Sequence, residues 1–365
     1  MRICHVIDNM FLDQGGPVAV VRGLARAQAA AGEQVGVLCR AQRRSGEAAC
    51  PEHALGGAVL LETGSSADAA ARLRLELDRF RPDMLHLHAV WEPVQRHAAR
   101  WALRHGVPWV LSSHGMLHPD PMSKGWLKKR LYLGLLGVAV RRARRVLVVN
   151  QEEADFVRRA LGTPAEVMPN GVEVDAAPPS HATPPTATEG SVLFVGRLQA
   201  LKGIEGLVRA YAIAARQGLS CPLALVGPDE GALDDVRKTA RDAGVDDRVH
   251  LLGPIYGDAK RAALRHCRML AHRPRYEGFG MTIVEAMAEG RPVVTTDRAG
   301  VARQCPGDIL KVAPDTDEGF ADAMLDLWRD PAAAQAMGDR ARAWVSSQLS
   351  WPAIASRVRA AYLAP

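Results

Sequence analysis

Short β-branched runs alternate with helical patterns along the whole chain, and this alternation constrains the fold more than any other feature. Each half opens in the same way: an apolar run, 3–7 or 191–195, is followed by a glycine-containing loop and a helix, 18–31 or about 203–217. Strands that are separated by helices pair in parallel. The pattern therefore predicts an α/β protein with two doubly wound parallel sheets.

The other predicted strands are short runs rich in apolar and β-branched residues: 34–38, 84–88, 109–112 and 145–149 in the first half, and 223–226, 249–252, 268–271 and 292–295 in the second.

The 365 residues suit two domains of roughly 150 to 190 residues each. We expect a first domain over 1–175, a linker over 176–190 and a second domain over 191–348. The linker is rich in Pro, Ala, Thr, Ser and His and has almost no periodicity. The last segment, 349–365, has the helix-start signal Ser350-Trp351-Pro352, and such a tail can cross back to the first domain.

Composition excludes several classes of protein. With 48% hydrophobic and 24% charged residues the chain is typical of a globular protein. No apolar run is long enough to span a membrane, and the amino-terminal residues are typical of a strand, so we expect a cytoplasmic protein. The six cysteines have no Cys-x-x-Cys spacing, which argues against a disulfide framework or a zinc site. Aromatic residues make up 5%, and no motif indicates nucleic-acid binding.

The most informative stretch is 273–287, which follows a predicted strand and opens a helix near Met281. Gly278 and Gly280 allow a sharp turn and a close approach to a ligand, and a helix start presents free amides to anions. Glu277 and Glu285 would reach different depths of one cleft, where carboxylates suit the hydroxyls of a sugar and a ribose. The simpler alternative is a solvated helix-face residue at 285 and a helix-start charge at 277.

A second candidate site follows the strand 191–195, at the carboxyl end where α/β proteins bind ligands. Arg197 and Lys202 could neutralise the charges of a nucleoside diphosphate, the former as a fork and the latter as a point charge. A metal ion would then not be obligatory. The alternative is a loop with two solvated cations.

The first half offers weaker candidates. Gln14-Gly15-Gly16-Pro17 separates the first strand from its helix; its amides could cap a phosphate, but the loop lacks the third glycine of a dinucleotide fingerprint. No Gly-x-x-x-x-Gly-Lys-Ser/Thr motif is present, which argues against a P-loop kinase or ATPase. His114 follows a strand and precedes a glycine, so it is either a ligand contact or a satisfied loop histidine.

His86 and His88 flank another strand end, and a His-x-His pair could bind a metal ion. We find no convincing third ligand in the sequence, and core packing is favoured for His86. We therefore predict no metal site.

The formal net charge of +6 is concentrated in the first half, and the segment 124–145 contributes much of it. An apolar run there lies between Lys128-Lys129-Arg130 and a second basic cluster. This basic, partly amphipathic element could rest on an anionic membrane, on the inner face, and bring the site to a lipid-linked acceptor. The alternative is a buried helix with solvated basic ends.

Together these features resemble the retaining glycosyltransferases of family four, which have the GT-B fold: two Rossmann-like domains facing across a cleft. The resemblance spans nearly the whole chain and rests on short motifs: Gly15-Gly16, His114, Met168-Pro169-Asn170-Gly171-Val172, Gly196-Arg197, Lys202-Gly203, Gly227, Gly253, and the pair Glu277 and Glu285 with seven residues between them. The sequence around His114 also looks like the subgroup that acts in exopolysaccharide and lipopolysaccharide assembly.

The resemblance implies residue roles. Glu277 would contact the transferred sugar, the amides of Gly278, Phe279 and Gly280 would support sugar and phosphate, and Glu285 would hold the ribose. Arg197, Lys202 and the Gly16 amide would bind the diphosphate, and His114 would lie beside the reacting sugar. The remaining expected donor contacts are Gly15, Gly227, Gly253, Ile255, Met281 and Thr282.

Three positions depart from the family pattern. Arg303 stands where many members have an acid, which puts the donor preference in question. Asn150 replaces a usual Ser or Thr, and Ala271-His272-Arg273-Pro274 replaces a common Pro-Ser stretch.

The sequence thus predicts a metal-independent retaining glycosyltransferase that needs no cofactor and uses a UDP- or GDP-sugar and a saccharide or lipid-linked saccharide acceptor. Two alternatives remain open: a sugar-nucleotide epimerase of the same fold, and a non-catalytic nucleotide-sugar-binding subunit.

Overall fold

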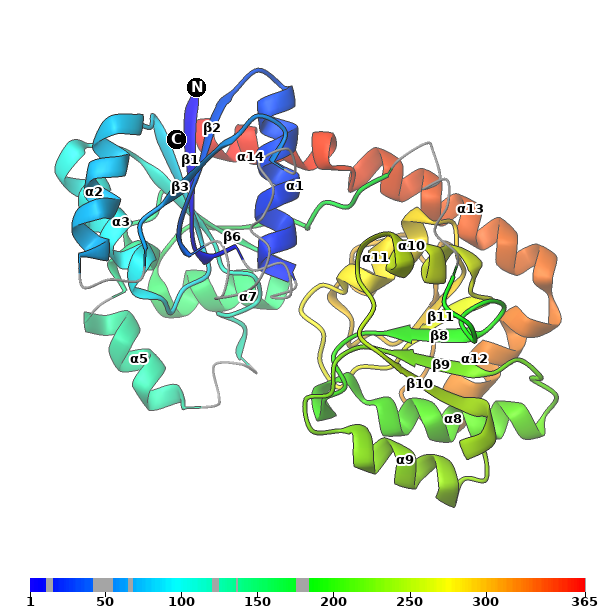
Figure 1. The fold of residues 1–365 in the computed structure, drawn as a ribbon. Helices are drawn as coiled ribbons and strands as arrows, with labels where there is room; N and C mark the ends of the chain where they lie inside the picture. Colours follow the sequence, from blue (N-terminus) through cyan, green and yellow to red (C-terminus); the bar gives the residue numbers. More distant parts are fainter. Residues whose placement is uncertain are drawn as a thin grey trace. The chain divides into compact units, whose positions relative to one another are not determined.

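A computed structural model describes residues 1–10, 16–41, 55–64, 68–119, 125–135, 137–174 and 184–364 (Figure 1). The chain divides into two compact units: unit 1 comprises Met1–Gly171 with Leu349–Pro365, and unit 2 comprises Val172–Gln348. Each unit has its own sheet and its own buried core.

Unit 1 is built on a parallel sheet in which the order of the strands is β3-β2-β1-β4-β5-β6-β7. Its strands are β1 (Arg2–Asn9), β2 (Gln34–Ala41), β3 (Val59–Glu62), β4 (Met84–His88), β5 (Trp109–Ser112), β6 (Arg145–Val148) and β7 (Ala165–Val167). Its helices are α1 (Gly16–Ala30), α2 (Ala69–Phe80), α3 (Pro93–His105), α5 (Trp126–Leu135), α6 (Val138–Arg141), α7 (Gln151–Phe156), the π-helical turn η3 (Val157–Leu161) and α14 (Trp351–Leu363). The central strands are buried on both faces, as expected of a parallel sheet covered by helices.

Unit 2 repeats this design with the strand order β10-β9-β8-β11-β12-β13. Its strands are β8 (Val192–Val195), β9 (Leu223–Val226), β10 (Val249–Gly253), β11 (Met269–His272), β12 (Val293–Thr295) and β13 (Lys311–Val312). Its helices are η4 (Ala200–Lys202), α8 (Ile204–Arg216), α9 (Leu233–Asp242), η5 (Asp246–Arg248), α10 (Gly257–His266), α11 (Met281–Ala288), η6 (Gly300–Arg303), α12 (Asp317–Arg329) and α13 (Pro331–Gln348). The predicted pair of doubly wound parallel sheets is confirmed.

The predicted strands are present, and three of them, β4, β5 and β9, have the predicted bounds. The sequence analysis missed β3, β7 and β13, each of which lies at the edge of its sheet. Edge strands are half-exposed, so they need no continuous apolar run. β13 has only two residues, and β7 reads Ala-Glu-Val, which gives no strand signal.

The boundary between the units falls at Gly171, a little before the expected linker over 176–190. The described end of that segment, from residue 184, packs on unit 2, where Thr188 is fully buried and the Gly190 amide donates to the His266 carbonyl at 2.8 Å. Residues 175–183 lie outside the described part of the chain.

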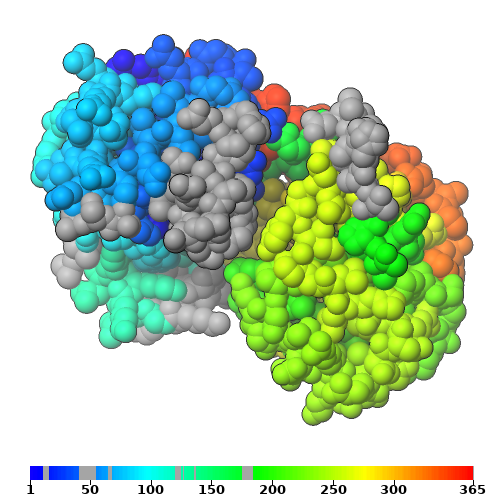
Figure 2. Space-filling view, in the orientation of Figure 1, coloured from blue at the N-terminus to red at the C-terminus, as the bar shows by residue number. Residues whose placement is uncertain are grey.

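The expected single basic element over 124–145 is wrong in detail. It consists of two helices, α5 and α6, and Lys124 lies outside the described residues. α6 buries Ala139 and Val140, whereas α5 lies on the outside of unit 1, where its atoms are drawn in teal (Figure 2). The alternative of a buried helix therefore fits α6 but not α5.

The C-terminal helix α14 completes unit 1 by packing on α1. The Trp351 indole fills space left by two glycines: a Cβ built on Gly23 would lie 1.9 Å from the ring, and one on Gly171 would lie 2.3 Å from it. Polar contacts fix the helix, since Arg359 pairs with Glu33 at 2.8 Å. The glycine at 171 of the Met-Pro-Asn-Gly motif is therefore required by packing.

Among the described residues, no helix is long and apolar enough to cross a membrane.

Replacing Gly23 with alanine should destabilise unit 1, because the new methyl group overlaps the Trp351 indole and overpacking costs about 1–3 kcal/mol. The measurement is the urea midpoint of unfolding. Gly134→Ala is the matched control: this helical glycine in α5 has open space at its Cβ, so alanine there should leave stability unchanged or raise it. Equal effects of the two substitutions would contradict the packing role of Trp351.

Candidate active site

Three glycines mark the carboxyl edge of the second sheet. Gly196 and Gly227 follow β8 and β9, and Gly253 ends β10. The Gly227 amide donates to the Gly253 carbonyl at 2.9 Å, and a Cβ at Gly227 would lie 1.8 Å from the Gly196 carbonyl oxygen. With its φ of +150°, Gly227 tolerates no side chain, so the loops here approach one another by their backbones.

Lys202 is delivered to this edge by a tight turn. It ends the short helix η4, and Gly203 follows with a φ of +63°. A Cβ at Gly203 would lie 2.2 Å from the Arg273 carbonyl, and the Arg275 amide donates to the Leu201 carbonyl at 3.0 Å. The Lys-Gly pair therefore packs directly against the loop that precedes Glu277.

The Glu277 carboxylate contacts two polar side chains of unit 2. It forms a close ion pair with Lys202 and accepts a hydrogen bond from His272 Nε2 at 3.4 Å. Burial alone would raise the pKa of Glu277, but the His272 hydrogen bond and the Lys202 charge outweigh it and lower the pKa to about 2. Glu277 is therefore an ionised, largely buried acceptor at neutral pH.

A second loop straps the Glu277 loop in place. The backbone amide of Glu277 donates to the Arg298 carbonyl. In return, the Gly300 amide donates to the Glu277 carbonyl at 3.0 Å, and the Val301 amide donates to the Phe279 carbonyl at 2.8 Å. The Phe279 side chain is buried, so only its backbone can contact a ligand. Gly280, with a φ of +106°, then starts α11, whose first amides lack intrahelical acceptors.

Glu285 lies inside α11, one turn after its start. Lys260 of α10 donates to its Oε1 at 2.7 Å. Its Oε2 is buried and accepts no hydrogen bond from any described residue. An unsatisfied buried carboxylate oxygen is costly, and a hydrogen-bond donor beside this atom would remove that cost. The solvated-face interpretation of Glu285 is not supported.

Arg197 pairs with a different carboxylate. Its guanidinium forms an ion pair with Glu230 at 3.3 Å, and both side chains are exposed. Of the two predicted cations, the structure joins only Lys202 to the glutamate. Met281 and Thr282 begin α11, and Ile255 is half-buried in the loop between β10 and α10.

His114 belongs to unit 1, in the loop after β5, and has a φ of +53°, which is rare for a residue with a side chain. A buried carboxylate holds this loop: Glu153 accepts hydrogen bonds from Ser113 Oγ at 2.8 Å and from the Leu117 amide at 2.9 Å. Asn150, a departure from the family pattern, caps α7, the helix that contains Glu153: its side-chain oxygen accepts a hydrogen bond from the Glu153 amide at 2.9 Å. Asn can serve this role as well as Ser or Thr.

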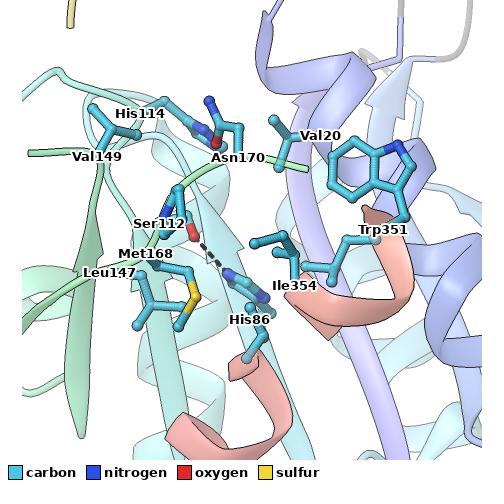
Figure 3. Close-up of a pocket in the computed structure, with 13 residues that line it drawn as sticks. Val20, His86, Ser112, His114, Leu147, Val149, Met168, Asn170, Trp351 and Ile354 are labelled. Carbon is cyan, nitrogen blue, oxygen red and sulfur yellow. Dashed lines mark hydrogen bonds between the residues drawn. The ribbon is translucent and has the colours of Figure 1, made fainter. Parts of the chain in front are cut away.

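A pocket in unit 1 lies around His114 (Figure 3). His86, Ser112, His114 and Asn170 supply its polar lining, while Trp351 contributes to an apolar side. Gly16 is the first residue of α1, and Gly15 lies outside the described residues.

A third histidine joins His86 and His88. His5 of β1 lies beside them, and ring nitrogens of the three residues lie within 4.8 Å of one another, a spacing that a metal ion could bridge. All three are buried, and their ring nitrogens already form hydrogen bonds within unit 1. The group contains no carboxylate to balance a cation. The preference for core packing at His86 agrees with its complete burial.

Sequence reasoning missed several partners of the site. His272 was noted only as a departure from the family pattern, although it ends β11 five residues before Glu277. Lys260 lies in α10 and Glu230 in the loop between β9 and α9, and neither residue carries a signal of its own in the sequence. Arg273 follows His272 in the stretch that departs from the family pattern. Its guanidinium donates to the Gly206 carbonyl at 2.9 Å and so ties the loop to α8.

Two family models match the chain, each over one half. Residues 14–176 match "Glycosyltransferase Family 4", and residues 181–344 match "Glycosyl transferases group 1". The fold and these family matches define a glycosyltransferase of the GT-B type. The chain belongs to the group 1, family four glycosyltransferases.

Individual proteins show the same relationship. Phosphatidyl-myo-inositol mannosyltransferase of Mycobacterium leprae is 28% identical, over 99% of this chain and 96% of its own. The structure of Anabaena HepE in complex with UDP-glucose superposes with a TM-score of 0.75 at 18% identity, covering 99% of this chain and 98% of the other. WaaG, a glycosyltransferase involved in lipopolysaccharide biosynthesis, gives a TM-score of 0.70 at 17% identity, covering all of both chains.

Two histidines of unit 1, the buried His5 and the half-buried His114, should make the free energy of unfolding fall in mild acid. Burial lowers the pKa values of His5 and His114 from 6.5 to about 4. Their contribution to the free energy of unfolding is complete above pH 6.5. It is lost as the pH falls from 6.5 to about 4, because in this range only the unfolded chain takes up the protons. Each should contribute a slope of about 1.4 kcal/mol per pH unit.

Denaturant unfolding at pH 7, 6 and 5 measures this slope. His114→Asn should have a shallower slope than the wild type. An unchanged slope in that variant would show that folding does not lower the pKa of His114.

Proposed function

We propose that this chain is a retaining, metal-independent glycosyltransferase that moves a sugar from a nucleoside-diphosphate sugar of the UDP or GDP type to a hydroxyl of a saccharide or lipid-linked saccharide. The observation that carries the proposal is the ion pair between Lys202 and Glu277 at the mouth of α11. A cation for phosphate and an ionised acceptor for sugar hydroxyls lie there in direct contact.

Each donor part has a matching group in unit 2. The pyrophosphate takes Lys202, Arg197 and the free amides at the start of α11, which suit an anion because the helix dipole is positive there. Glu277 accepts hydroxyls of the transferred sugar, and the unsatisfied Oε2 of Glu285 accepts a ribose hydroxyl. The exposed Arg197 side chain breaks its ion pair with Glu230 and binds the phosphate instead.

The chemistry requires stabilisation of the departing group rather than a protein nucleophile. The bond between the anomeric carbon and the β-phosphate oxygen breaks, and the acceptor hydroxyl forms its bond on the same face. The leaving phosphate oxygen takes the hydroxyl proton. Lys202 and the loop amides stabilise the charge that grows on the diphosphate, and such electrostatic stabilisation is usually the main source of rate enhancement in a site of this kind. Glu277 orients the sugar.

Relatives support this assignment of substrates. The Anabaena protein binds UDP-glucose, the mycobacterial protein is a mannosyltransferase that acts on phosphatidyl-myo-inositol, and WaaG is involved in lipopolysaccharide biosynthesis. They favour a nucleotide-sugar donor and a glycan or lipid acceptor, and we place this chain in surface polysaccharide biosynthesis. His114 is proposed to contact the transferred sugar.

Removing the Lys202 charge should reduce kcat about a hundredfold, equivalent to about 3 kcal/mol of transition-state stabilisation. The assay is sugar transfer or donor hydrolysis with a panel of UDP- and GDP-sugars. Lys238→Ala, which removes an exposed lysine of α9, is the control and should retain full turnover. Full turnover by Lys202→Ala would rule out the role of Lys202.

We further propose that α5 rests on an anionic membrane surface, on the inner face. Leu127 and Leu131 lie one turn apart and are 66% and 60% exposed, and Lys128 is exposed beside them. The opposite side of the helix is anchored, because Leu133 is buried and Tyr132 packs edge-on against Trp91. Exposed leucines next to lysines suit the interface of an anionic bilayer.

Flotation with liposomes of phosphatidylcholine, with and without phosphatidylglycerol, tests this contact. The protein should float only with the anionic lipid, and a Leu127→Ser, Leu131→Ser double variant should lose most of that binding. Leu103→Ser, at a leucine of α3 that is 50% exposed, is the control. Absence of lipid dependence, or equal loss in the control, would contradict the membrane proposal.

A further inference from the structure

A chain of buried polar side chains connects the C-terminal helix to His114. It runs through unit 1, two of its members, His86 and His114, line the pocket of Figure 3, and each link is a hydrogen bond between side chains. Its members come from five places in the fold: Tyr362 of α14, Gln28 of α1, His5 of β1, His86 and His88 of β4, and His114 after β5. The proposed roles of Glu277 and Lys202 make no use of this network.

One amide group sets the direction of the hydrogen bonds. Gln28 Nε2 donates to the Tyr362 hydroxyl at 3.1 Å, so the amide oxygen of Gln28 faces His5 Nε2 at 2.7 Å. An amide oxygen can only accept, so His5 must carry its proton on Nε2. Burial lowers the pKa of His5 to about 4, which makes the ring neutral and leaves a lone pair on Nδ1.

The same assignment of donor and acceptor nitrogens extends from His5 to His88 and His114. His5 Nδ1 lies 2.9 Å from His88 Nε2, so His88 donates there and keeps a lone pair on its own Nδ1. That nitrogen lies 3.1 Å from His114 Nε2, which must donate in turn. Burial keeps the pKa of His88 well below its usual value and that of His114 at about 4, so both rings are neutral. His114 is left with a lone pair on Nδ1, to which no described residue donates.

A side branch obeys the same rule. Because the Tyr362 hydroxyl accepts from Gln28, its own proton is available for His86 Nδ1 at 2.7 Å. His86 then donates from Nε2 to Ser112 Oγ, also at 2.7 Å, which is the bond drawn in Figure 3. Turning the Gln28 amide over would reverse every bond in both branches and would place a proton on His114 Nδ1.

We propose that Gln28, His5 and His88 are positioning residues that hold His114 in the tautomer with its proton on Nε2, so that Nδ1 accepts a hydrogen bond from a substrate hydroxyl. This rests on the proposed function of the chain as a sugar transferase. A ring that presents an acceptor selects a ligand that donates, which a saccharide hydroxyl can do and a phosphate oxygen cannot. Tyr362 couples the tautomer to the docking of the C-terminal helix.

Nitrogen-15 NMR of protein labelled at histidine tests the tautomers directly and needs no substrate. At pH 7, the signals of His114, His88 and His5 should be those of neutral rings protonated on Nε2. The His114 signals are identified as those lost in His114→Asn. A proton on Nδ1 of His114 would overturn the proposal, as would one equivalent of zinc retained by the purified protein, since a metal ion would take the same lone pairs.

Two variants test the relay. Gln28→Leu removes the amide that directs the chain, so His114 should populate both tautomers and kcat should fall about tenfold while KM for the donor changes little. Tyr362→Phe removes the partner of the amide and should shift the tautomers in the same direction. Thr163→Val, which removes a buried hydroxyl of unit 1 that lies outside this network, is the control and should leave the His114 tautomer unchanged.

The outcomes separate this inference from the proposed function. The predicted tautomer in a chain without transferase or donor-hydrolysis activity would support the relay and contradict the proposed function. Transfer activity with unchanged His114 tautomers in Gln28→Leu would contradict the relay alone.

Discussion

The site of unit 2 depends on one geometric constraint: the carboxyl ends of parallel strands meet at one edge of a sheet. The loops after β8, β9 and β11 must then pack against one another by their backbones. Gly203 and Gly227 make this possible, because a side chain at either would overlap a carbonyl oxygen. Once the loops are this close, Lys202 and Glu277, which are far apart in sequence, become direct neighbours.

The Lys202 and Glu277 pair also explains how a carboxylate can remain ionised while largely buried. Desolvation disfavours the charge, and the pair with Lys202 and the hydrogen bond from His272 outweigh that cost. The result is a charge distribution fixed before any ligand arrives. A preorganised cation and acceptor need little rearrangement as charge moves onto a leaving diphosphate, and this is the physical basis of the catalysis proposed for the chain.

The sequence predicted the fold because buried strands leave local signals, and it predicted a candidate site from one local motif. Apolar runs such as Leu223–Val226 identify buried strands. The Glu-Gly-Phe-Gly stretch predicts an anion-binding corner, and a helix does begin directly after it. What the sequence left out depends on tertiary contacts: the edge strands, the ion pair of Arg197 with Glu230, and the junction of His5 with His86 and His88. His5 lies on a neighbouring strand, 81 residues before His86, and no spacing rule connects them.

The most direct test of the account compares the affinities for a nucleoside diphosphate and for the matching nucleotide sugar by isothermal titration calorimetry. If Glu277 binds the sugar and Glu285 the ribose, Glu277→Gln should weaken binding of the nucleotide sugar but not of the diphosphate, since it also frees Lys202 for the phosphates. Glu285→Gln should weaken both ligands alike. Equal loss of both ligands in the two variants, or no loss in either, would contradict the division of the donor between the two glutamates.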